Sequence, residues 1–234
     1  MNVINIEKKM HKTNLVAVIA AAGIGKRVGA AIPKQYLTLL GKTIVEHSIQ
    51  PFLDHPDIHQ VVVSIAKNDT WFVNLPIATH CKIQLVEGGA ERVDSVLSAL
   101  QLIDQDAYVL VHDAARPCIT RGDIDSLIDH VCCSQQGAIL ATSVRDTMKR
   151  TDAQGNIIKT VERTHLWHAL TPQMFNNRLL IAAIKAADNL DKITDEASAL
   201  ELAGIPVGIV EGRGDNIKVT RQEDLKLAEL YLTQ

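Results

Sequence analysis

The sequence has few aromatic residues and no excess of positive charge. Only eight of its 234 residues are aromatic, two Trp, three Tyr and three Phe, and the formal net charge is −3 at pH 7. Proteins that bind nucleic acid present a basic face or aromatic side chains on which bases stack. We therefore expect no nucleic-acid partner for this chain.

The sequence also lacks long hydrophobic runs. No uninterrupted apolar stretch reaches the roughly 18 residues that suggest a membrane-spanning helix. Residues 1–12 are polar and mixed in charge, without the apolar middle of a secretory signal. We expect no membrane association, a cytoplasmic location, and a flexible tail over residues 1–13.

Cysteine is scarce as well. The four cysteines are Cys81, Cys118, Cys132 and Cys133, and they form no Cys-x-x-Cys pair. No cluster of histidines completes a zinc site with them. The sequence therefore predicts buried, unreactive thiols in a reducing compartment rather than a zinc centre.

What the sequence does contain is a regular alternation of two kinds of segment. Apolar, β-rich segments alternate with segments whose apolar residues follow helical spacing. The predicted strands are 16–20, 60–66, 82–86, 108–112, 137–144, 205–210 and 217–219. The predicted helices are 43–53, 91–103, 123–131, 177–188, 195–203 and 222–232.

This alternation predicts an α/β fold with a doubly wound, mostly parallel twisted sheet. Strands separated by helices form parallel sheets with right-handed crossovers. Nearly continuous apolar strands indicate that helices cover both faces of the sheet. In such sheets ligands bind beyond the carboxyl ends of the strands. We expect one domain over residues 14–234, with its site among the residues that follow the strands.

One segment interrupts the alternation. Residues 145–173 hold two β-like pieces around a turn signal, Asp-Ala-Gln-Gly-Asn, at 152–156. The pattern predicts a β-hairpin arm that projects from the sheet at about 145–170. A two-stranded ribbon is only marginally stable alone in water, so we expect the arm to dock on a second subunit. A long loop packed on its own domain is the alternative.

A glycine-rich loop follows the first predicted strand. Residues 20–36 are AAAGIGKRVGAAIPKQY, in which the glycines have the spacing Gly-x-Gly-x-x-x-Gly. A dinucleotide-binding loop needs one residue fewer between the last two glycines. A Walker loop ending in the Gly-Lys-Thr at 41–43 would need a glycine where Tyr36 stands. The spacing of the glycines disfavours both loop types. Without a dinucleotide-binding loop, it also disfavours an NAD-dependent oxidoreductase.

The composition of this loop nevertheless suits a phosphate-rich ligand. Gly23 and Gly25 allow backbone amides to approach phosphate oxygens, and Lys26, Arg27 and Lys34 add positive charge. A nucleoside triphosphate carries about four negative charges at neutral pH. Amides, cations and Mg²⁺ together would offset that charge. On the loop alone, a plain tight turn remains an alternative.

Further motifs resemble those of a known enzyme family. The loop, from Gly23-x-Gly25-x-Arg27 to the Pro-Lys-Gln-Tyr at 33–36, resembles the signature of sugar-phosphate nucleotidyltransferases. The segment VLVHDAARP at 109–117 resembles more closely the 2-C-methyl-D-erythritol 4-phosphate cytidylyltransferases of isoprenoid precursor synthesis. Segments similar to this family follow in order: GGAERVDSV (88–96), RDTMKR (145–150), LWHALTPQ (166–173), TDEASALE (194–201) and DNIKVT (215–220). The resemblance spans about residues 14–233.

The resemblance implies a fold, a reaction and partners. The fold would be the Rossmann-like nucleotidyltransferase fold with a projecting arm. The reaction would transfer CMP from CTP to 2-C-methyl-D-erythritol 4-phosphate and release pyrophosphate. The cofactor would be Mg²⁺ or another divalent cation, and the protein would be a homodimer whose arms reach the partner's site.

The resemblance also implies roles for individual residues. The catalytic cations would be Arg27, Lys34 and Lys218. The nucleotide would contact Ala21, Ala22, Gly23, Gly25, Lys26, Gly89, Ser95 and Ala114. The acceptor would contact Asp113, Arg116, Thr147, Arg163 and Thr194, and the metal would be held by Asp113 and Asp215.

Simpler interpretations of some of these residues stay open at this point. Asp113 could cap a turn, Arg116 could be a surface cation, and Arg163 could pair with Glu162 or Asp152. No histidine is assigned as a general base, because a phosphate monoester with a second pKa near ~6 is already largely ionised at neutral pH.

Other functions also remain open. The chain could be a cytidylyltransferase for another polyol phosphate, such as ribitol 5-phosphate, or a catalytically silent nucleotide-binding protein. Ala20 stands where many relatives have proline, and Ala90 stands where an aspartate often follows the two glycines. If that aspartate normally contacts the base, Ala90 would alter cytosine selectivity.

Overall fold

The computed structural model describes residues 14–23 and 32–234. The tail expected over residues 1–13 lies outside the described residues. So do three of the expected site residues, Gly25, Lys26 and Arg27.

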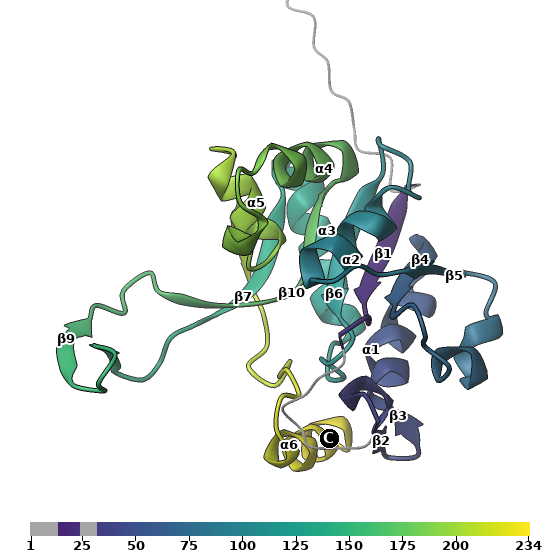
Figure 1. Cartoon of the computed structure of the whole chain (residues 1–234), viewed down its shortest axis with the longest axis horizontal. Helices are drawn as coiled ribbons and strands as arrows, with labels where there is room; N and C mark the ends of the chain where they lie inside the picture. Colours follow the sequence, from purple (N-terminus) through teal and green to yellow (C-terminus); the bar gives the residue numbers. More distant parts are fainter. Residues whose placement is uncertain (1–13, 24–31) are drawn as a thin grey trace, which may run out of the picture.

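A twisted seven-stranded sheet forms the centre of the molecule, with the strand order β11-β7-β10-β6-β1-β4-β5 (Figure 1). The strands are β1 (Leu15–Ala20), β4 (Ile58–Ile65), β5 (Ile83–Glu87), β6 (Tyr108–Asp113), β7 (Ala138–Ser143), β10 (Trp167–Asn176) and β11 (Gly208–Glu211). All neighbouring strands are parallel except β10, which is antiparallel to both β6 and β7. The predicted α/β fold with a mostly parallel sheet is confirmed.

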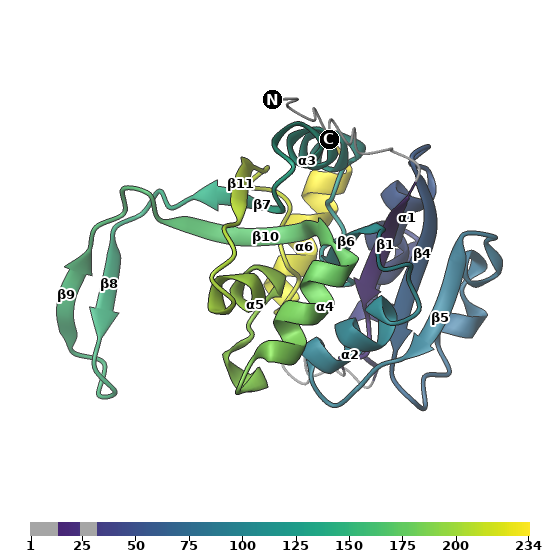
Figure 2. The same ribbon diagram turned by 90° about the horizontal axis from the view of Figure 1, so that it is seen from above.

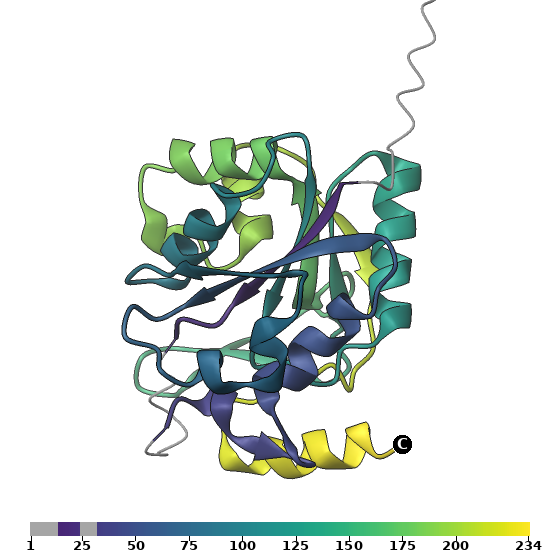
Figure 3. The same ribbon diagram turned by 90° about the vertical axis from the view of Figure 1, so that its right-hand side faces the viewer.

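Helices cover both faces of this sheet (Figure 3). They are α1 (Ile44–Leu53), α2 (Arg92–Leu100), α3 (Arg121–Ser134), α4 (Asn177–Ala186), α5 (Glu196–Leu202) and α6 (Gln222–Leu232). Helices α1 and α3 pack on one face, whereas α2, α4 and α5 pack on the other. Because side chains alternate along a strand, Ala17 of β1 joins the first core and Val16 joins the second.

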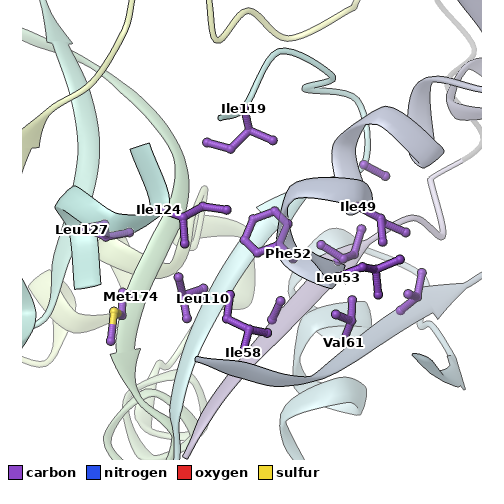
Figure 4. Close-up of a cluster of buried hydrophobic side chains, with 14 of the residues drawn as sticks. Ile49, Phe52, Leu53, Ile58, Val61, Leu110, Ile119, Ile124, Leu127 and Met174 are labelled. Atoms are coloured by element: carbon purple, nitrogen blue, oxygen red, sulfur yellow. The ribbon is translucent and has the colours of Figure 1, made fainter. Parts of the chain in front are cut away.

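The first of these cores is built from large aliphatic side chains around Phe52 (Figure 4). Ile49, Phe52 and Leu53 of α1 face Val61 and Leu110 of the sheet. Phe52 is completely buried, and truncating such a side chain to alanine typically costs about 3–5 kcal/mol of stability. This packing fixes the carboxyl ends of β1 and β6 relative to the loops that follow them.

Shorter elements complete the chain. A small ribbon, β2 (Thr38–Leu39) with β3 (Lys42–Thr43), precedes α1, and α6 packs near it against Leu39 and Ile44. Single turns of 3₁₀-helix lie at η2 (Lys34–Tyr36), η3 (Phe72–Asn74), η4 (Pro76–Thr79) and η5 (Leu190–Lys192). No helix within the described ranges is long and apolar enough to cross a membrane.

The largest difference from the sequence prediction concerns β10. The predicted arm extends to about residue 170, whereas residues from Trp167 onward form strand β10, which lies inside the sheet between β6 and β7. The polar residues of this segment gave no strand signal, because a central strand of a parallel sheet is usually a continuous apolar run. Pro172 also argued against a strand interior, and β10 tolerates it at a register shift between Ala169 and Gln173.

Two strand predictions near the carboxyl terminus need correction. No strand forms at 217–219, because Val219 makes a single backbone bond, from its N–H to the carbonyl of Ala115 at 2.8 Å, rather than a ladder. The strand expected at 205–210 begins only at Gly208. Pro206 explains the delay, since proline cannot donate to a sheet ladder.

The arm itself is a two-stranded antiparallel ribbon of β8 (Met148–Thr151) and β9 (Ile157–Val161). It projects away from the sheet and its helices (Figure 2). The predicted turn forms: Gly155 has a φ of +88°, and Asp152 accepts hydrogen bonds from the backbone of Gln154 and Asn156. Ile157 and Ile158 are 65% and 61% exposed, so the ribbon leaves apolar surface uncovered.

The prediction of buried thiols is wrong for two of the four cysteines. Cys118 is buried, whereas Cys81 and Cys133 are exposed. Cys133 lies on α3, whose buried face carries Leu127, Ile128 and Val131. Because successive residues of a helix are rotated by about 100°, Cys133, two residues after Val131, lies on the opposite side of α3 and faces solvent.

Candidate active site

A cavity of about 340 Å³ opens at the carboxyl ends of β1 and β6. This is the edge of the sheet where ligands bind in open α/β folds, and the volume falls in the range of small-molecule sites. Nine of the seventeen residues predicted for the site line it: Ala21, Ala22, Gly23, Lys34, Gly89, Ser95, Asp113, Ala114 and Lys218. The structure therefore brings together residues nearly 200 positions apart in the sequence.

The remaining predicted residues within the described part of the chain do not line this cavity. Thr147 and Arg163 are exposed at the base of the arm, and the guanidinium of Arg163 donates to the carbonyl of Arg145. Thr194 is exposed just before α5. Asp215 pairs with Arg213. Their roles toward an acceptor or metal stay predictions.

Arg116 is not a surface cation. It is only 8% exposed, and its guanidinium donates to the carbonyl of Asn216 at 2.8 Å. Its Nε lies 3.5 Å from Oδ2 of Asp113. Burial lowers the pKa of Arg116, although Asp113 opposes this effect. Arg116 therefore does not line the cavity but connects Asp113 to the backbone of Asn216 beneath it.

Gln35 holds the start of the glycine loop. Its side-chain amide donates to the carbonyls of Ala21 at 2.7 Å and Gly23 at 3.0 Å. The turn that carries Gln35 is anchored at its other end, where the hydroxyl of Tyr36 donates to Asp69 at 2.6 Å. Gln35 lines the cavity, although the sequence motifs predicted no role for it.

The opposite wall of the cavity is a tight loop before α2. A Cβ atom on Gly88 would lie 2.5 Å from Cβ of Ala22 and 2.7 Å from Oγ of Ser95. A Cβ on Gly89 would lie 2.2 Å from Cβ of Asp94. Ser95 is buried and accepts from the backbone N–H of Gly89 at 3.1 Å. Because only glycine fits here, backbone groups form this wall and can recognise a planar base.

Asp113 is the electrostatic centre of the cavity. Its Oδ1 lies 3.0 Å from Nε of Arg92, and its Oδ2 lies 2.9 Å from Nζ of Lys218. Burial alone would raise the pKa of Asp113, but Arg92, Lys218 and Arg116 together lower it well below its usual range. The carboxylate is therefore ionised, and three cations surround it.

Two lysines complete the charge of the cavity. Nζ of Lys34 donates to the carbonyl of Val219 at 2.9 Å, which joins the loop after β1 to the chain segment that carries Lys218. Lys218 is 40% exposed, so its ammonium is accessible to a ligand in the cavity. Two lysines that line the same cavity suit an anionic ligand such as a polyphosphate.

Arg92 is the residue that the sequence prediction missed. It lines the cavity and bridges Asp113 to the buried Glu196, with contacts of 2.6 and 3.1 Å to the two Glu196 oxygens. Burial by itself would lower the pKa of Arg92, but Glu196 and Asp113 raise it further above its ordinary value. A signal was present: a cation at the first position of a helix opposes the helix dipole unless carboxylates compensate it.

His112 supports Asp113 from inside the core. The backbone N–H of Asp113 donates to the hydroxyl of Thr171 at 3.2 Å, and that hydroxyl lies 2.9 Å from Nδ1 of His112. Nε2 of His112 lies 3.2 Å from the carbonyl of Arg116. Burial lowers the pKa of His112 to about 4, outweighing the opposing effect of Asp113. His112 is therefore a neutral structural residue.

The family model of the 2-C-methyl-D-erythritol 4-phosphate cytidylyltransferases matches residues 15–234. The chain belongs to this family. Curated relatives with that name include proteins from Aeromonas hydrophila, 56% identical over 95% of this chain and 91% of theirs, and from Vibrio cholerae, 52% identical over 94% and 97%.

Solved structures of the family have the same fold. The crystal structure of the 2-C-methyl-D-erythritol 4-phosphate cytidylyltransferase of Francisella tularensis is 37% identical, with a TM-score of 0.80, over 93% of this chain and 99% of that one. A crystal structure of 4-diphosphocytidyl-2C-methyl-D-erythritol synthase is 32% identical, with a TM-score of 0.81, over 94% and 98%. The cytidylyltransferase fold thus extends over nearly the whole chain.

The donor groups of the cavity bear on how a metal ion would bind to this cytidylyltransferase. Among the residues that the structure describes, no three His, Cys, Asp or Glu side chains gather into a metal cluster. Asp113 faces the cavity, and Oδ1 of Asp215 is buried without a hydrogen-bond partner. One or two carboxylates suit Mg²⁺, which is commonly held jointly with substrate phosphates.

Proposed function

We propose that this chain transfers CMP from CTP to 2-C-methyl-D-erythritol 4-phosphate and releases pyrophosphate. The observation that carries the proposal is the cavity at the end of β1. There, in a chain of the cytidylyltransferase family, Arg92 and Lys218 contact Asp113, and Lys34 lines the same cavity beside a wall of backbone groups. We take residues 14–234 as one catalytic domain that includes the arm.

The nucleotide would lie between the two glycine loops. The base would contact backbone groups at Ala21, Ala22, Gly89 and Ser95, with Ala114 beside the sugar. The triphosphate would lie toward Gly23 and Lys34, where Gly25, Lys26 and Arg27 of the same loop follow in the sequence. This arrangement would put positive charge where the leaving pyrophosphate gains negative charge.

The reaction needs no covalent enzyme intermediate and no general base. An oxygen of the acceptor phosphate, already ionised at neutral pH, attacks the α-phosphorus of CTP in line and forms the new P–O bond. The bond from the α-phosphorus to the bridging oxygen breaks, and pyrophosphate leaves with that electron pair. The catalytic work of Arg27, Lys34 and Lys218 is positioning and charge stabilisation.

A divalent cation, Mg²⁺ or another, would bind with the substrate phosphates. Asp113 would be a protein ligand or a contact to the acceptor, and Asp215 would support the same region. When bound, the ion neutralises charge on the transferring and leaving phosphates. The residues of this chain would orient it rather than enclose it.

The acceptor would be bound by residues from two subunits. Thr147 and Arg163 lie at the base of the arm and do not line the cavity of their own chain. The arm projects from the body and exposes Ile157 and Ile158. We propose that it packs on the partner of a homodimer, where Arg163 pairs with the acceptor phosphate of the partner's site. Asp113, Arg116 and Thr194 would belong to the chain that holds the nucleotide.

A pyrophosphate-release assay tests the function. Purified protein is supplied with Mg²⁺, with one nucleotide from CTP, ATP, GTP and UTP, and with one acceptor from a panel of polyol phosphates. We expect release only with CTP and 2-C-methyl-D-erythritol 4-phosphate. Faster pyrophosphate release with ribitol 5-phosphate would identify that compound as the acceptor instead. CTP binding without pyrophosphate release would indicate a catalytically silent nucleotide-binding protein.

A further inference from the structure

The shortest contact of each Asp113 oxygen is made by a different cation, while Arg116 lies 3.5 Å from Oδ2. The cations of the two shortest contacts differ in how firmly they are held. Lys218 reaches Oδ2 with one ammonium contact at 2.9 Å and is 40% exposed. Arg92 reaches Oδ1 through Nε at 3.0 Å, and both terminal nitrogens of the same guanidinium are engaged by Glu196. A single exposed ammonium can turn toward a ligand, whereas a planar guanidinium bound at three atoms is fixed in place.

Glu196 is well placed to hold Arg92 and does not itself face the cavity. Its side chain is 3% exposed, and it is absent from the lining of the cavity. It is the first residue of α5, directly after the N-cap Asp195. A buried carboxylate needs a charged partner, and the fork of Arg92 satisfies both of its oxygens.

The start of α5 is in turn locked to the central sheet. The side-chain amide of Gln173, on β10, donates to Asp195 at 2.9 Å, and its oxygen accepts from the backbone N–H of Ala197 at 3.0 Å. Gln173 is almost completely buried. Glu196 is therefore held by β10 on one side and holds Arg92 of α2 on the other.

We infer that Arg92, held by Glu196, is a positioning residue that keeps Asp113 oriented toward the acceptor when Lys218 turns to the phosphates. The inference rests on the proposed function and extends it. Thr194, expected at the acceptor, lies just before α5, and Glu196 is the first residue of that helix. The same helix start would therefore position both residues. Nucleotide recognition depends on the backbone of the glycine loops, so it is independent of this link.

The variant Glu196→Gln tests the inference. Residue 196 does not line the cavity, and glutamine has nearly the size of glutamate but carries no charge. The exposed Glu201, on the same helix, gives the matched control Glu201→Gln. We expect Glu196→Gln to lower kcat/KM for the acceptor by about 10-fold to 100-fold, as misplacement of a reacting group by about 1 Å does. The dissociation constant for CTP, measured by calorimetry, should change by less than about twofold.

Arg92→Lys is the second variant, since it keeps the positive charge but not the fork, and circular dichroism checks the fold of both variants. Arg92→Lys should also lower kcat/KM for the acceptor. Because both residues act through one link, the double variant should have a kcat/KM no lower than that of the less active single variant. An acceptor kcat/KM equal to that of Glu201→Gln would overturn the inference. A loss of CTP affinity in Glu196→Gln as large as its loss of acceptor kcat/KM would also overturn the inference. Failure of the unchanged protein to release pyrophosphate would instead refute the proposed function.

Discussion

Lys218 and Asp113 form an ion pair at the cavity, with 2.9 Å between Nζ and Oδ2, although they are separated by more than 100 residues in the chain. Asp113 is buried and Lys218 is 40% exposed. Lys218 is thus held beside the site by a fixed carboxylate while its ammonium stays accessible. This arrangement leads to the first prediction.

Lys218→Ala should lower turnover by about 10²-fold or more, as the loss of one transition-state donor does elsewhere. The measurement is the rate of pyrophosphate release at saturating CTP and acceptor. Lys226→Ala removes an exposed lysine from α6 and serves as the control. Full activity in Lys218→Ala would remove that residue from the catalytic set.

Gly88→Ala should weaken CTP binding by about 10-fold or more. The added Cβ would lie 2.5 Å from Cβ of Ala22 and 2.7 Å from Oγ of Ser95, so the two walls proposed to enclose the base would have to separate. Gly122→Ala is the control, since its Cβ would meet only Oγ1 of Thr120 at 3.9 Å. Calorimetric titration with CTP measures the effect, and unchanged affinity would show that the base binds elsewhere.

The stability of the protein should fall with decreasing pH between about 6.5 and 4, because His112 is buried neutral. Its pKa is lowered from 6.5 to about 4 in the folded state, so the unfolded chain binds more protons in this window. The free energy of unfolding then decreases by up to about 1.4 kcal/mol per pH unit from this residue. Above pH 6.5 the contribution no longer changes.

Comparing urea unfolding of the wild type and His112→Gln over this pH range isolates the effect. The variant should show a shallower loss of stability as the pH falls, even if it is less stable at pH 7. His59→Gln, which replaces an exposed histidine of β4, controls for the substitution. Parallel curves for the wild type and His112→Gln would contradict the prediction.

Mixing two inactive variants should restore activity if the arm completes the partner's site. Arg163→Ala removes the proposed acceptor contact on the arm, and Lys218→Ala removes a cation in the body. In an equal mixture, half of the dimers are mixed and each has one intact site, so about a quarter of wild-type activity is expected. Activity that stays at the level of the separate variants would place Arg163 in its own chain's site or remove it from catalysis.

Most of the fold could be predicted from local patterns. The strands β1, β4 and β6 are apolar runs, and α1 has both helical spacing and the capping pair Thr43 and Glu46. Strand β10 could not be predicted, because its place between β6 and β7 depends on partners that lie elsewhere in the chain. A polar strand with a proline has no local signal that separates it from a loop.

The candidate site divides in the same way. The glycines and lysines of the cavity were identified from motifs, because their spacing along the chain carries the signal. The link from Arg92 to Glu196 joins residues 104 positions apart, and no local pattern encodes it. It exists only once α2 and α5 pack on the same face of the sheet.

The sequence by itself determined the α/β architecture, the family and many of the residues that line the cavity, because apolar periodicity and motif spacing are properties of neighbouring residues. Only the tertiary structure decided which charges meet. It buried Asp113 among Arg92, Arg116 and Lys218, and it left Thr147 and Arg163 outside the cavity of their own chain. Electrostatic interactions depend on distance in space, and chain separation says little about that distance.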